Sequence, residues 1–387
     1  MMKAVVCQNK QLWVADRPDP RPASGQVVLK VLRCGICGSD LHVRHHCDHW
    51  GGLMARSGYK QLTSSQQSVV LGHEFSGEVM EYGPQTQGKL KPGTPVVALP
   101  FLRVGQDIAG IGLSARTDGA YAERVAVQES MVMRIPNGLS PTVAALTEPM
   151  AVAWHAVRRA EIKRKDVAVV IGCGPVGLAT ICTLKARGVK TIVAADFAEG
   201  RRKLALTSGA DIAVNPAETS PFADWREWGC LGDLPSMIEL AMNTREQLAK
   251  IPVPWWHTWR LAEALGALPP RPIVFECVGV PGVLQGIIDG APQFTRVVVV
   301  GVCMQSDQIE PAVAINKEID LRFALGYSPL EFRDTLMAMA EGLLRCEHLI
   351  TGQVGLDQVD AAFSALSDPN RHAKILIAPQ QTSPASI

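Results

Sequence analysis

The sequence predicts an α/β protein with a β-rich N-terminal part and a doubly wound parallel sheet in its second half. Short apolar runs, broken by a proline-rich segment, fill residues 3–33 and are typical of strands in a small β-rich domain. Between residues 168 and 301, β-branched runs alternate with stretches in which apolar residues recur at helical spacing. Strands that alternate with helices in this way form parallel sheets covered by helices.

A glycine-rich turn joins the first strand and the first helix of this second half. The apolar run 168–171 ends in the motif Gly172-Cys173-Gly174-Pro175-Val176-Gly177. Helical spacing then continues to Gly188, and the next β-branched run, residues 191–195, stops at Asp196. The pattern predicts one complete strand, turn, helix and strand unit.

This unit has the features of a dinucleotide-binding site. Gly172 permits the sharp turn, Gly174 lets the main chain approach a pyrophosphate, and Gly177 lets helix and strand pack closely. The helix N-terminus offers N–H groups to the phosphates. Asp196 lies about twenty residues further on, where a carboxylate binds the ribose hydroxyls. The motif alone also fits an ordinary strand-to-helix turn, but the complete unit favours the dinucleotide.

Composition limits the other functions that the chain can have. The chain has 387 residues, enough for two or three domains, with 47% hydrophobic and 19% charged residues. Lys plus Arg (38) balances Asp plus Glu (37), so we expect a small-molecule partner and no nucleic acid. No apolar run approaches the roughly 18 residues that span a bilayer, so we expect no membrane partner and a cytoplasmic protein. The ten cysteines lack the paired spacing of a disulfide framework.

Candidate metal ligands follow the N-terminal strands. Cys37 comes after the strand predicted at 27–32, His73 and Glu74 follow the apolar residues 69–71, and Glu148 opens a predicted helix. Thiolate, imidazole and carboxylate are zinc ligands, and three protein ligands that leave the fourth position open make a catalytic site. The sequence therefore predicts a catalytic zinc site, with either glutamate as its third ligand.

Two other cysteine and histidine patterns have simpler explanations. Cys34 and Cys37 could form a redox pair or half of a zinc knuckle, but no second cysteine pair follows. A second cluster cannot converge on one tetrahedral ion, because sequence neighbours point in different directions, and we expect a polar loop at His45, His46, Cys47 and His49.

These motifs resemble the zinc-containing alcohol dehydrogenases of the medium-chain dehydrogenase/reductase superfamily. The resemblance is carried by Gly72-His73-Glu74-x2-Gly77-x5-Gly83, by Cys37-Gly38-Ser39-Asp40-x-His42 and by the glycine motif. It is greatest for the sorbitol, butanediol and threonine dehydrogenase branch, through Glu148-Pro149 and Ala151-Val152-Ala153-Trp154-His155.

The resemblance implies specific roles for residues of this chain. It implies a catalytic zinc held by Cys37, His73 and either Glu74 or Glu148, and a proton relay from the substrate through Ser39 to His42. It also implies cofactor contacts at Gly172, Gly174, Pro175, Val176, Gly177, Asp196, Arg201, Gly279, Gly301, Val302 and Lys374. Asp196 favours NAD, because a carboxylate repels the 2′-phosphate of NADP, although Arg201 and Arg202 lie nearby.

The same resemblance divides the chain into two domains. Residues 1–150, completed by 320–387, correspond to a GroES-like β-rich catalytic domain that ends in a tail at 379–387. Residues 151–319 correspond to a Rossmann domain, interrupted by a tryptophan-rich insertion at 217–271. Clustered tryptophans can mark an interface or a pocket wall, but we expect the insertion to form a small core of its own. Because no cysteine lies between Cys47 and Cys173, we expect no structural zinc.

We therefore predict a zinc-dependent oxidoreductase that transfers hydride between a secondary or polyhydric alcohol and NAD. Zinc would act as a Lewis acid that makes the alkoxide accessible near neutral pH. The alternatives are a zinc-free enone or quinone reductase of the same superfamily and a non-catalytic dinucleotide-binding protein. We also expect a homodimer or homotetramer.

Overall fold

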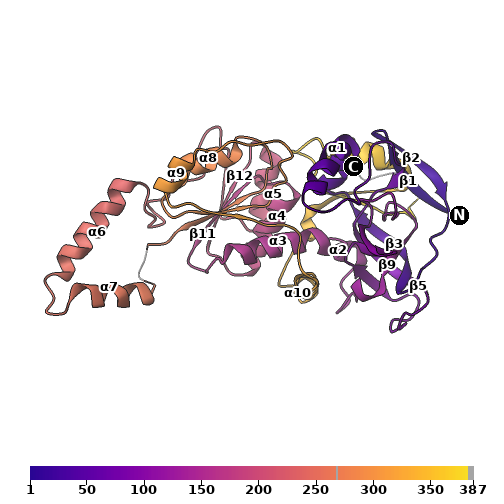
Figure 1. The fold of residues 1–387 in the computed structure, drawn as a ribbon, viewed down its shortest axis with the longest axis horizontal. Coiled ribbons are helices and arrows are strands. Elements are labelled where there is room, and N and C mark those ends of the chain that lie inside the picture. The colour runs from indigo at the N-terminus through magenta and orange to yellow at the C-terminus, as the bar shows by residue number, and fades with distance from the viewer. Residues whose placement is uncertain (267–268, 382–387) are drawn as a thin grey trace. The chain divides into compact units, whose positions relative to one another are not determined.

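The computed structural model describes residues 1–266 and 269–381, which form two compact units (Figure 1). The first unit contains Met1–His155, Gly174–Cys182 and Gly326–Ile387, and the second contains Ala156–Cys173 and Thr183–Leu325. These units are defined by packing alone, and the domain boundaries given above remain predictions. Most of the tail expected at residues 379–387 lies outside the described residues.

The second unit contains the predicted parallel sheet. Its strands are β11 (Val167–Ile171), β12 (Thr191–Ala195), β13 (Ile212–Val214), β14 (Pro272–Glu276), β15 (Arg296–Val299) and β16 (Asp320–Phe323). Their order is β13-β12-β11-β14-β15-β16, and every neighbouring pair is parallel. From β11 the chain adds strands first toward one edge of the sheet, through β12 and β13, and then toward the other edge, through β14, β15 and β16. Doubly wound sheets bind ligands beyond the strand ends at this reversal of strand order, here between β11 and β14.

The sheet is built from nearly continuous apolar strands, as expected for parallel strands that are buried on both faces. Val169, Val193, Val274 and Val297 belong to one buried cluster across four of the strands. Helix α8 (Val283–Gly290) contributes Ile287 to the same cluster. Burial of these β-branched side chains supplies the main stabilisation of the unit.

The sixth strand differs from the sequence prediction, which ended this domain at residue 319. Strand β16 pairs in parallel with β15, and Asp320 lies opposite Arg296 in the register. The buried Arg296 guanidinium donates to the Asp320 carboxylate at 2.6 Å. Because β16 contains charged residues that pair with a charge on the neighbouring strand, its sequence lacks the apolar run by which the other strands were recognised. The sequence analysis therefore placed residue 320 outside this sheet.

Two further helices follow the predicted order. Helix α4 (Pro175–Ala186) begins in the glycine motif, and α5 (Glu199–Ser208) follows β12. Helix α5 ends at Gly209, whose φ of 112° is a conformation that side chains other than glycine rarely adopt. A short helix, α9 (Pro311–Asn316), precedes β16.

The insertion between β13 and β14 does not form the small separate core that the sequence predicted. Its first part joins the sheet instead, because Phe222 is buried in the cluster beside β11 and Trp228 packs against it. The remainder forms helices α6 (Leu234–Leu248) and α7 (Trp255–Ala264), in which no described residue is buried. The tryptophans of α7 therefore lie outside any buried core.

The first unit is rich in β-strands that form three sheets. The strands are β1 (Met2–Gln8), β2 (Gln11–Arg17), β3 (Gln26–Gly35), β4 (Val69–Val70), β5 (Glu74–Tyr82), β6 (Pro95–Ala98), β7 (Phe101–Val104), β8 (Asp107–Gly110), β9 (Arg124–Gln128), β10 (Val132–Arg134), β17 (Ile350–Val354) and β18 (Lys374–Ile377). The largest sheet has the order β10-β6-β5-β3-β18-β17, with β9 also paired to β3. Strand β18 therefore lies beside β3, in the same unit as the N-terminal strands.

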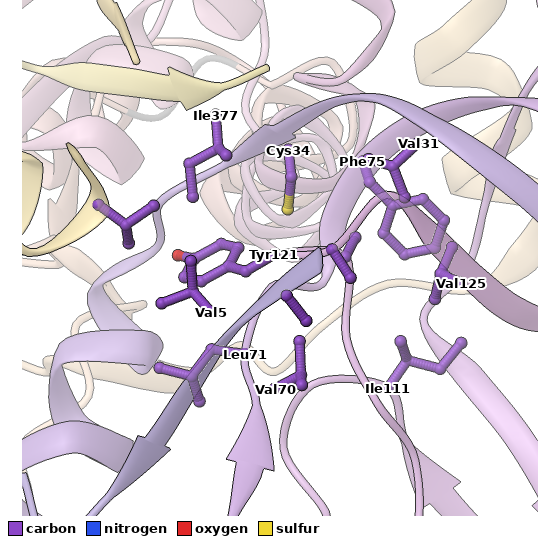
Figure 2. Close-up of a cluster of buried hydrophobic side chains, with 14 of the residues drawn as sticks. Val5, Val31, Cys34, Val70, Leu71, Phe75, Ile111, Tyr121, Val125 and Ile377 are labelled. Atoms are coloured by element: carbon purple, nitrogen blue, oxygen red, sulfur yellow. The ribbon is translucent and has the colours of Figure 1, made fainter. Parts of the chain in front are cut away.

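The larger of two buried hydrophobic clusters described in the first unit surrounds the β3 and β5 strands, and a smaller one includes Val97, Phe332 and Leu336. Figure 2 shows Val5, Leu71, Phe75 and Tyr121 converging with Cys34 from separate elements. The Tyr121 ring is fully buried, and its edge meets the ring of Phe363 at 6.2 Å between centroids. This core fixes the loops that carry the candidate ligands.

Helix α1 (Gly38–Arg56) corrects the prediction of a polar loop at His45, His46, Cys47 and His49. Cys37 is its N-cap, and the Asp40 side chain accepts from the Cys37 N–H in a capping box. Val43 and Cys47, four residues apart, form its buried face. Helical spacing was masked by the run of polar residues, and the backbone leaves helical geometry only at His46.

Four further helices complete the description: α2 (Pro141–Ala144), α3 (Thr147–Ala160), α10 (Pro329–Ala340) and α11 (Val359–Ala365). Single 3₁₀ turns occur at Glu129–Met131, Glu347–Leu349 and Leu356–Gln358. Among the described residues, no helix combines the length and apolarity that crossing a bilayer requires.

The start of α10 depends on one buried carboxylate. Glu331 accepts from the Ser328 N–H at 2.7 Å and lies 3.0 Å from Nδ1 of His155 on α3. Ser328 in turn accepts from the Glu331 N–H, which completes a capping box. Although burial opposes ionisation, these contacts lower the pKa of Glu331.

Replacing Glu331 by alanine is therefore expected to lower the free energy of unfolding by about 2–3 kcal/mol, because both the cap and the His155 partner are lost. Urea unfolding followed by circular dichroism measures this change. Glu341→Ala, at the exposed end of the same helix, is the matched control and is expected to change stability by less than about 0.5 kcal/mol. Equal losses in the two variants would contradict the role of the buried contacts.

Candidate metal centre and dinucleotide-binding turn

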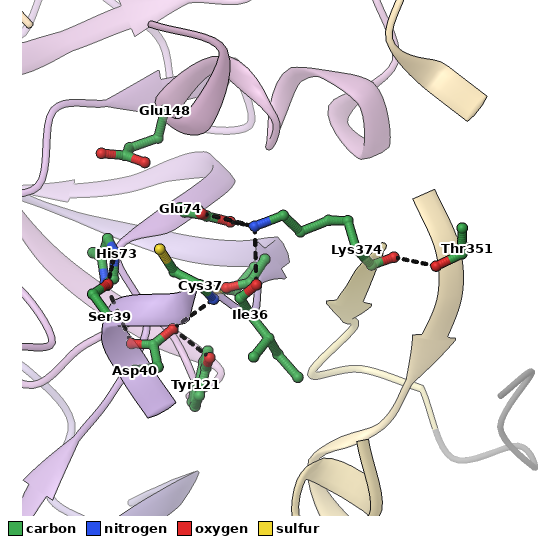
Figure 3. Close-up of polar contacts among 12 residues, drawn as sticks. Ile36, Cys37, Ser39, Asp40, His73, Glu74, Tyr121, Glu148, Thr351 and Lys374 are labelled. Carbon is green, nitrogen blue, oxygen red and sulfur yellow. Dashed lines mark hydrogen bonds and ion pairs between the residues drawn. The ribbon is translucent and has the colours of Figure 1, made fainter. Parts of the chain in front are cut away.

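Three of the predicted ligands come together in the first unit. The Cys37 sulfur, a His73 ring nitrogen and a Glu74 carboxylate oxygen all lie within 4.8 Å of one another (Figure 3). Cys37 follows β3 as the cap of α1, His73 immediately precedes β5, and Glu74 is the first residue of β5. Because β3 and β5 are paired neighbours, their adjoining ends bring the three ligands to one edge.

Pairing of β3 with β5 also explains the glycine that faces the ligands. Gly35 lies directly opposite Glu74 in the register. A Cβ atom at Gly35 would overlap the Glu74 carboxylate. This position therefore excludes any side chain, and the space is taken by the glutamate.

A buried carboxylate behind His73 was not predicted from the sequence. Oδ1 of Asp40 lies 3.4 Å from Nδ1 of His73, while Oδ2 accepts from the Cys37 N–H at 2.9 Å and from the Tyr121 hydroxyl at 2.7 Å. Burial opposes the charge of both Asp40 and His73, but their mutual attraction lowers the pKa of Asp40 and raises that of His73. Asp40 thus orients two candidate ligands at once.

The second ring nitrogen of His73 is directed at Ser39, the first residue of the predicted proton relay. Nε2 of His73 lies 3.0 Å from the Ser39 hydroxyl oxygen. Nδ1 faces the Asp40 carboxylate at 3.4 Å, and a neutral imidazole that keeps its proton on Nδ1 presents its Nε2 lone pair outward, the arrangement typical of zinc-bound histidine. Ser39 is therefore beside the atom that would bind a metal.

The donor set fits a zinc ion. Zinc accepts thiolate, imidazole and carboxylate together, and tetrahedral zinc ligands lie about 3.5 Å apart. The three atoms within 4.8 Å reach that spacing by a small contraction. Burial and the Glu74 charge raise the pKa of the Cys37 thiol, although His73 opposes them, so a cation is needed to hold the thiolate at neutral pH.

Lys374 lies in a place that the sequence analysis did not foresee. Its ammonium contacts both Glu74 oxygens at 2.9 and 2.7 Å and donates to the Ile36 carbonyl at 2.9 Å (Figure 3). All three ammonium protons are used, and the side chain is buried. The expected contact with cofactor phosphates therefore has no free proton in this arrangement.

Glu148 faces the same site from the start of α3. Its Oε1 accepts from the Tyr327 hydroxyl at 2.8 Å, and its carboxylate lies beyond the group formed by Cys37, His73 and Glu74 (Figure 3). Burial, with help from the Glu74 charge, raises the pKa of Glu148 to about 7, although His73 opposes the shift. Tyr327 comes from a distant segment and has no local sequence signal.

His42 lies one turn into α1 and is half-buried. Its ring packs edge-on against Trp50, with 6.2 Å between the ring centroids. Burial, together with the charge of His46, lowers the pKa of His42. The imidazole is therefore neutral at pH 7 and able to accept a proton.

The dinucleotide motif has the predicted local form. Gly172 follows β11 with a φ of 89°, and a Cβ atom there would lie 2.6 Å from the Val278 side chain. Helix α4 then begins at Pro175, so the N–H groups of its first turn lack intrahelical acceptors. Gly174, Val176 and Gly177 occupy this first turn, as an anion site at a helix N-terminus requires.

Asp196 closes the same turn. Its carboxylate accepts from the Cys173 N–H and the Ala198 N–H, each at 2.8 Å. Arg201 lies 3.9 Å from this carboxylate, and Arg202 donates to the Asp196 and Phe197 carbonyls. Each carboxylate oxygen keeps a lone pair for a ribose hydroxyl.

The remaining predicted cofactor residues, Gly279 on one turn and Gly301 and Val302 on another, lie against each other. A Cβ atom at Gly279, whose φ is 72°, would lie 2.7 Å from the Val302 nitrogen. The Glu276 side chain accepts from the Val278 and Gly279 N–H groups, while its carbonyl accepts from Gly301. The turns after β14 and β15 therefore form one close-packed main-chain surface.

Comparison with known proteins identifies the class that this fold and site define. Residues 23–137 match the family model described as "Alcohol dehydrogenase GroES-like domain". The chain is 31% identical over 391 residues to (R,R)-butanediol dehydrogenase of Bacillus subtilis, with 98% of this chain and 100% of the relative covered. The chain belongs to the zinc-type alcohol dehydrogenases of the medium-chain dehydrogenase/reductase superfamily, which are oxidoreductases that act on CH–OH donors.

Within that family, the chain falls in the sorbitol, butanediol and threonine dehydrogenase branch. It is 28% identical over 391 residues to L-threonine 3-dehydrogenase of Streptomyces avermitilis, covering 97% of this chain and 99% of the relative. The crystal structure of 2R,3R-butanediol dehydrogenase from Bacillus subtilis superposes with a TM-score of 0.75 at 30% identity, covering 98% of this chain and 100% of that chain. The predicted family and fold class are confirmed.

The position of Asp40 generates a test of the metal centre. Asp40→Asn is expected to weaken zinc binding about 10–100-fold, because the carboxylate that holds His73 is lost. Competition with a chromogenic chelator measures the affinity. Asp48→Asn, an exposed carboxylate on the same helix, is the control and is expected to bind zinc like the unmodified protein. Unchanged affinity in Asp40→Asn would contradict the orienting role.

Proposed function

We propose that the chain is a zinc-dependent dehydrogenase that transfers hydride between a secondary or polyhydric alcohol and NAD. The observation that carries the proposal is the convergence of Cys37, His73 and Glu74 with Asp40 behind the histidine. Its relatives include a butanediol dehydrogenase and a threonine dehydrogenase. Both substrates carry a hydroxyl beside a second polar group, and we propose the same feature for the substrate of this chain.

Cys37, His73 and Glu74 would hold the zinc. Glu74 is favoured over Glu148 as the third ligand because it lies within the 4.8 Å group, and its unused lone pairs remain available beside Lys374. Glu148 is fixed by Tyr327 outside that group. We assign to Glu148 a position facing the substrate.

The chain's own residues then handle the proton. When bound, zinc lowers the pKa of a coordinated hydroxyl, and the nicotinamide ring accepts the hydride. Ser39 is placed to receive the hydroxyl proton, since its oxygen lies beside Nε2 of His73. His42, neutral at pH 7, would pass the proton to solvent.

Cofactor binding is assigned to the turn after β11 and its neighbours. Gly172, Gly174, Pro175, Val176 and Gly177 would contact the pyrophosphate, and Asp196 with Arg201 would contact the ribose. Gly279, Gly301 and Val302 would line the nicotinamide. Lys374 is left out of this set, because Glu74 and Ile36 take its three protons.

The partner of the chain is a small molecule, and we propose that it is an alcohol or the corresponding ketone. We further propose a cytoplasmic homodimer or homotetramer. The domains are assigned to residues 1–150 with a completing segment after β16, and to residues 151–323 with the insertion at 217–271.

The purified protein is expected to contain one zinc per chain and to oxidise 2,3-butanediol or a related polyol with NAD. Treatment with 1,10-phenanthroline should abolish turnover while leaving the far-ultraviolet circular dichroism unchanged, because the first unit has a large core that does not involve the metal. Elemental analysis and absorbance of NADH measure both outcomes.

Glu148→Gln separates the two candidate third ligands. This variant should retain one zinc per chain, whereas loss of the metal would transfer the ligand role from Glu74 to Glu148. Full turnover in metal-free protein would instead favour the zinc-free reductase, and absence of turnover with every alcohol and ketone tested would favour a non-catalytic protein.

Replacing His42 by alanine is expected to slow alcohol oxidation about a hundredfold at pH 7. The loss should shrink as pH rises, because hydroxide and buffer then take the proton. In the unmodified protein the lowered pKa of His42 keeps the imidazole neutral at pH 7, and the rate should fall at the more acidic pH where the imidazole becomes protonated. His45→Ala, exposed on the same helix, is the control for the pH profile of kcat.

Asp196→Ser is expected to raise the ratio of kcat/KM with NADP to that with NAD at least tenfold, because the carboxylate that repels a 2′-phosphate is removed beside Arg201. The unmodified protein should prefer NAD. Glu199→Ser, an exposed carboxylate at the start of α5, serves as the control. A preference for NADP before any substitution would refute the role given to Asp196.

A further inference from the structure

The helical hairpin of the second unit leaves its side chains unburied among the residues of that unit that the structure describes. We define the hairpin as residues 234–264, which comprise α6, a proline-containing connection and α7. Figure 1 shows the two helices projecting from the parallel sheet of the same unit. None of the described residues of either helix is buried. Helices of 15 and 10 residues are marginal in water without tertiary packing, so this hairpin needs a partner.

One side of the hairpin is a groove lined by tryptophans and charged side chains. Ala241 and Arg245 of α6, and Arg260, Glu263 and three tryptophans of α7 (Trp255, Trp256 and Trp259), line a hollow of about 470 Å³. Trp255 packs edge-on against both of the other tryptophans, with 6.1 and 6.2 Å between ring centroids. The Arg245 guanidinium lies over the Trp255 ring, 4.6 Å from its centroid.

The apolar surface continues along α6 beyond the groove. Leu234, Ile238 and Met242 recur every four residues and therefore form one stripe, which adjoins Ala241 and Arg245. Their exposed fractions are 39%, 49% and 59%, and that of Trp256 is 47%. Contiguous apolar patches of several hundred Å² on a soluble protein mark an interaction surface, and tryptophan with arginine dominates the energy of such surfaces.

Charge points to the chemistry of the partner. Within residues 234–264, three acidic side chains (Glu239, Glu246 and Glu263) balance three basic ones (Arg245, Lys250 and Arg260). A neutral surface has no attraction for nucleic acid or for anionic lipid headgroups. It does suit a copy of itself, because two-fold symmetry lets an arginine of one groove meet a glutamate of the other.

The extent of the surface agrees with a second copy as partner. A specific interface buries at least about 1,000 Å² in total, and the groove and the stripe together extend along both exposed helices, which are 15 and 10 residues long. Two hairpins placed face to face also give the helix packing of a four-helix arrangement, which covers every apolar residue of the groove and the stripe.

We infer that the groove between α6 and α7 binds the same groove of a second copy of this chain. The insertion is then an assembly element of the oligomer, and its tryptophans become buried only between copies.

Sedimentation velocity of the full chain tests the inference with a matched pair of variants. Trp256→Glu places a charge in the groove, whereas Leu261→Glu places the same charge about 140° around the same helix, at a leucine that is also exposed. The mass of the Trp256→Glu assembly should be half that of the unmodified protein, while Leu261→Glu should leave the mass unchanged. Circular dichroism establishes that both variants fold.

Three results would overturn the inference: a monomeric unmodified protein, an unchanged mass for Trp256→Glu, or equal dissociation by both variants. Amide hydrogen exchange gives an independent measurement, since protection of residues 234–264 should rise with protein concentration. Protection that does not vary with concentration, but appears on adding phosphatidylglycerol vesicles, would identify a lipid surface as the partner and reject the second copy.

Discussion

The first unit depends on one buried ion pair, between Lys374 and Glu74. These residues are 300 positions apart, and the pair joins the closing strand β18 to the strand that carries the ligands. Both side chains are almost fully buried, so neither charge can be exposed to water if the other is lost. Breaking such a pair is costly because it leaves an uncompensated charge in the core. The bond to the Ile36 carbonyl extends this constraint to the residue before Cys37.

The same pair sets the electrostatics of the candidate metal centre. Cys37 as thiolate, Glu74 and Glu148 would place three negative charges near one ion, and Lys374 compensates one of them. Burial opposes the charge of Lys374, but the negative charges of Glu74, Cys37 and Glu148, with the hydrogen bond to Glu74, together raise the pKa of the lysine. Lys374 therefore acts as a fixed cation of the site, and the network explains how a buried group of acids and a thiol is tolerated before a metal binds.

Local patterns were predictable from the sequence wherever one strand or one turn determined them. The unit from β11 to Asp196 agrees with the prediction almost residue by residue, because its glycines and β-branched runs have no competing conformation. Helix α1 was missed because its polar run conceals a narrow buried face of Val43 and Cys47. Strand β16 was missed because its charged residues, one of which pairs with Arg296 on the neighbouring strand, interrupt the apolar pattern on which the prediction relied.

At the candidate metal centre, too, some residues could be predicted from local sequence and others could not. Cys37, His73 and Glu74 were identifiable from residue type and spacing, but Asp40 was not assigned a role, although its place three residues after a helix cap was a usable signal. Tyr121 and Tyr327 had no signal at all, since each reaches the site from a segment far away in the chain. Residues that bind can be found from local chemistry, whereas residues that orient them depend on tertiary packing.

Gly72 shows how far this packing reaches. The residue has a φ of 99°, and a Cβ atom there would meet the Tyr121 ring and lie 2.8 Å from the Cys34 sulfur. Any side chain at this position would displace the tyrosine whose hydroxyl holds Asp40. A substitution that touches neither ligand nor substrate would thus impair the metal centre through the core. In a survey of inactive variants, positions such as Gly72 would be counted with the catalytic residues, although they carry no reactive group.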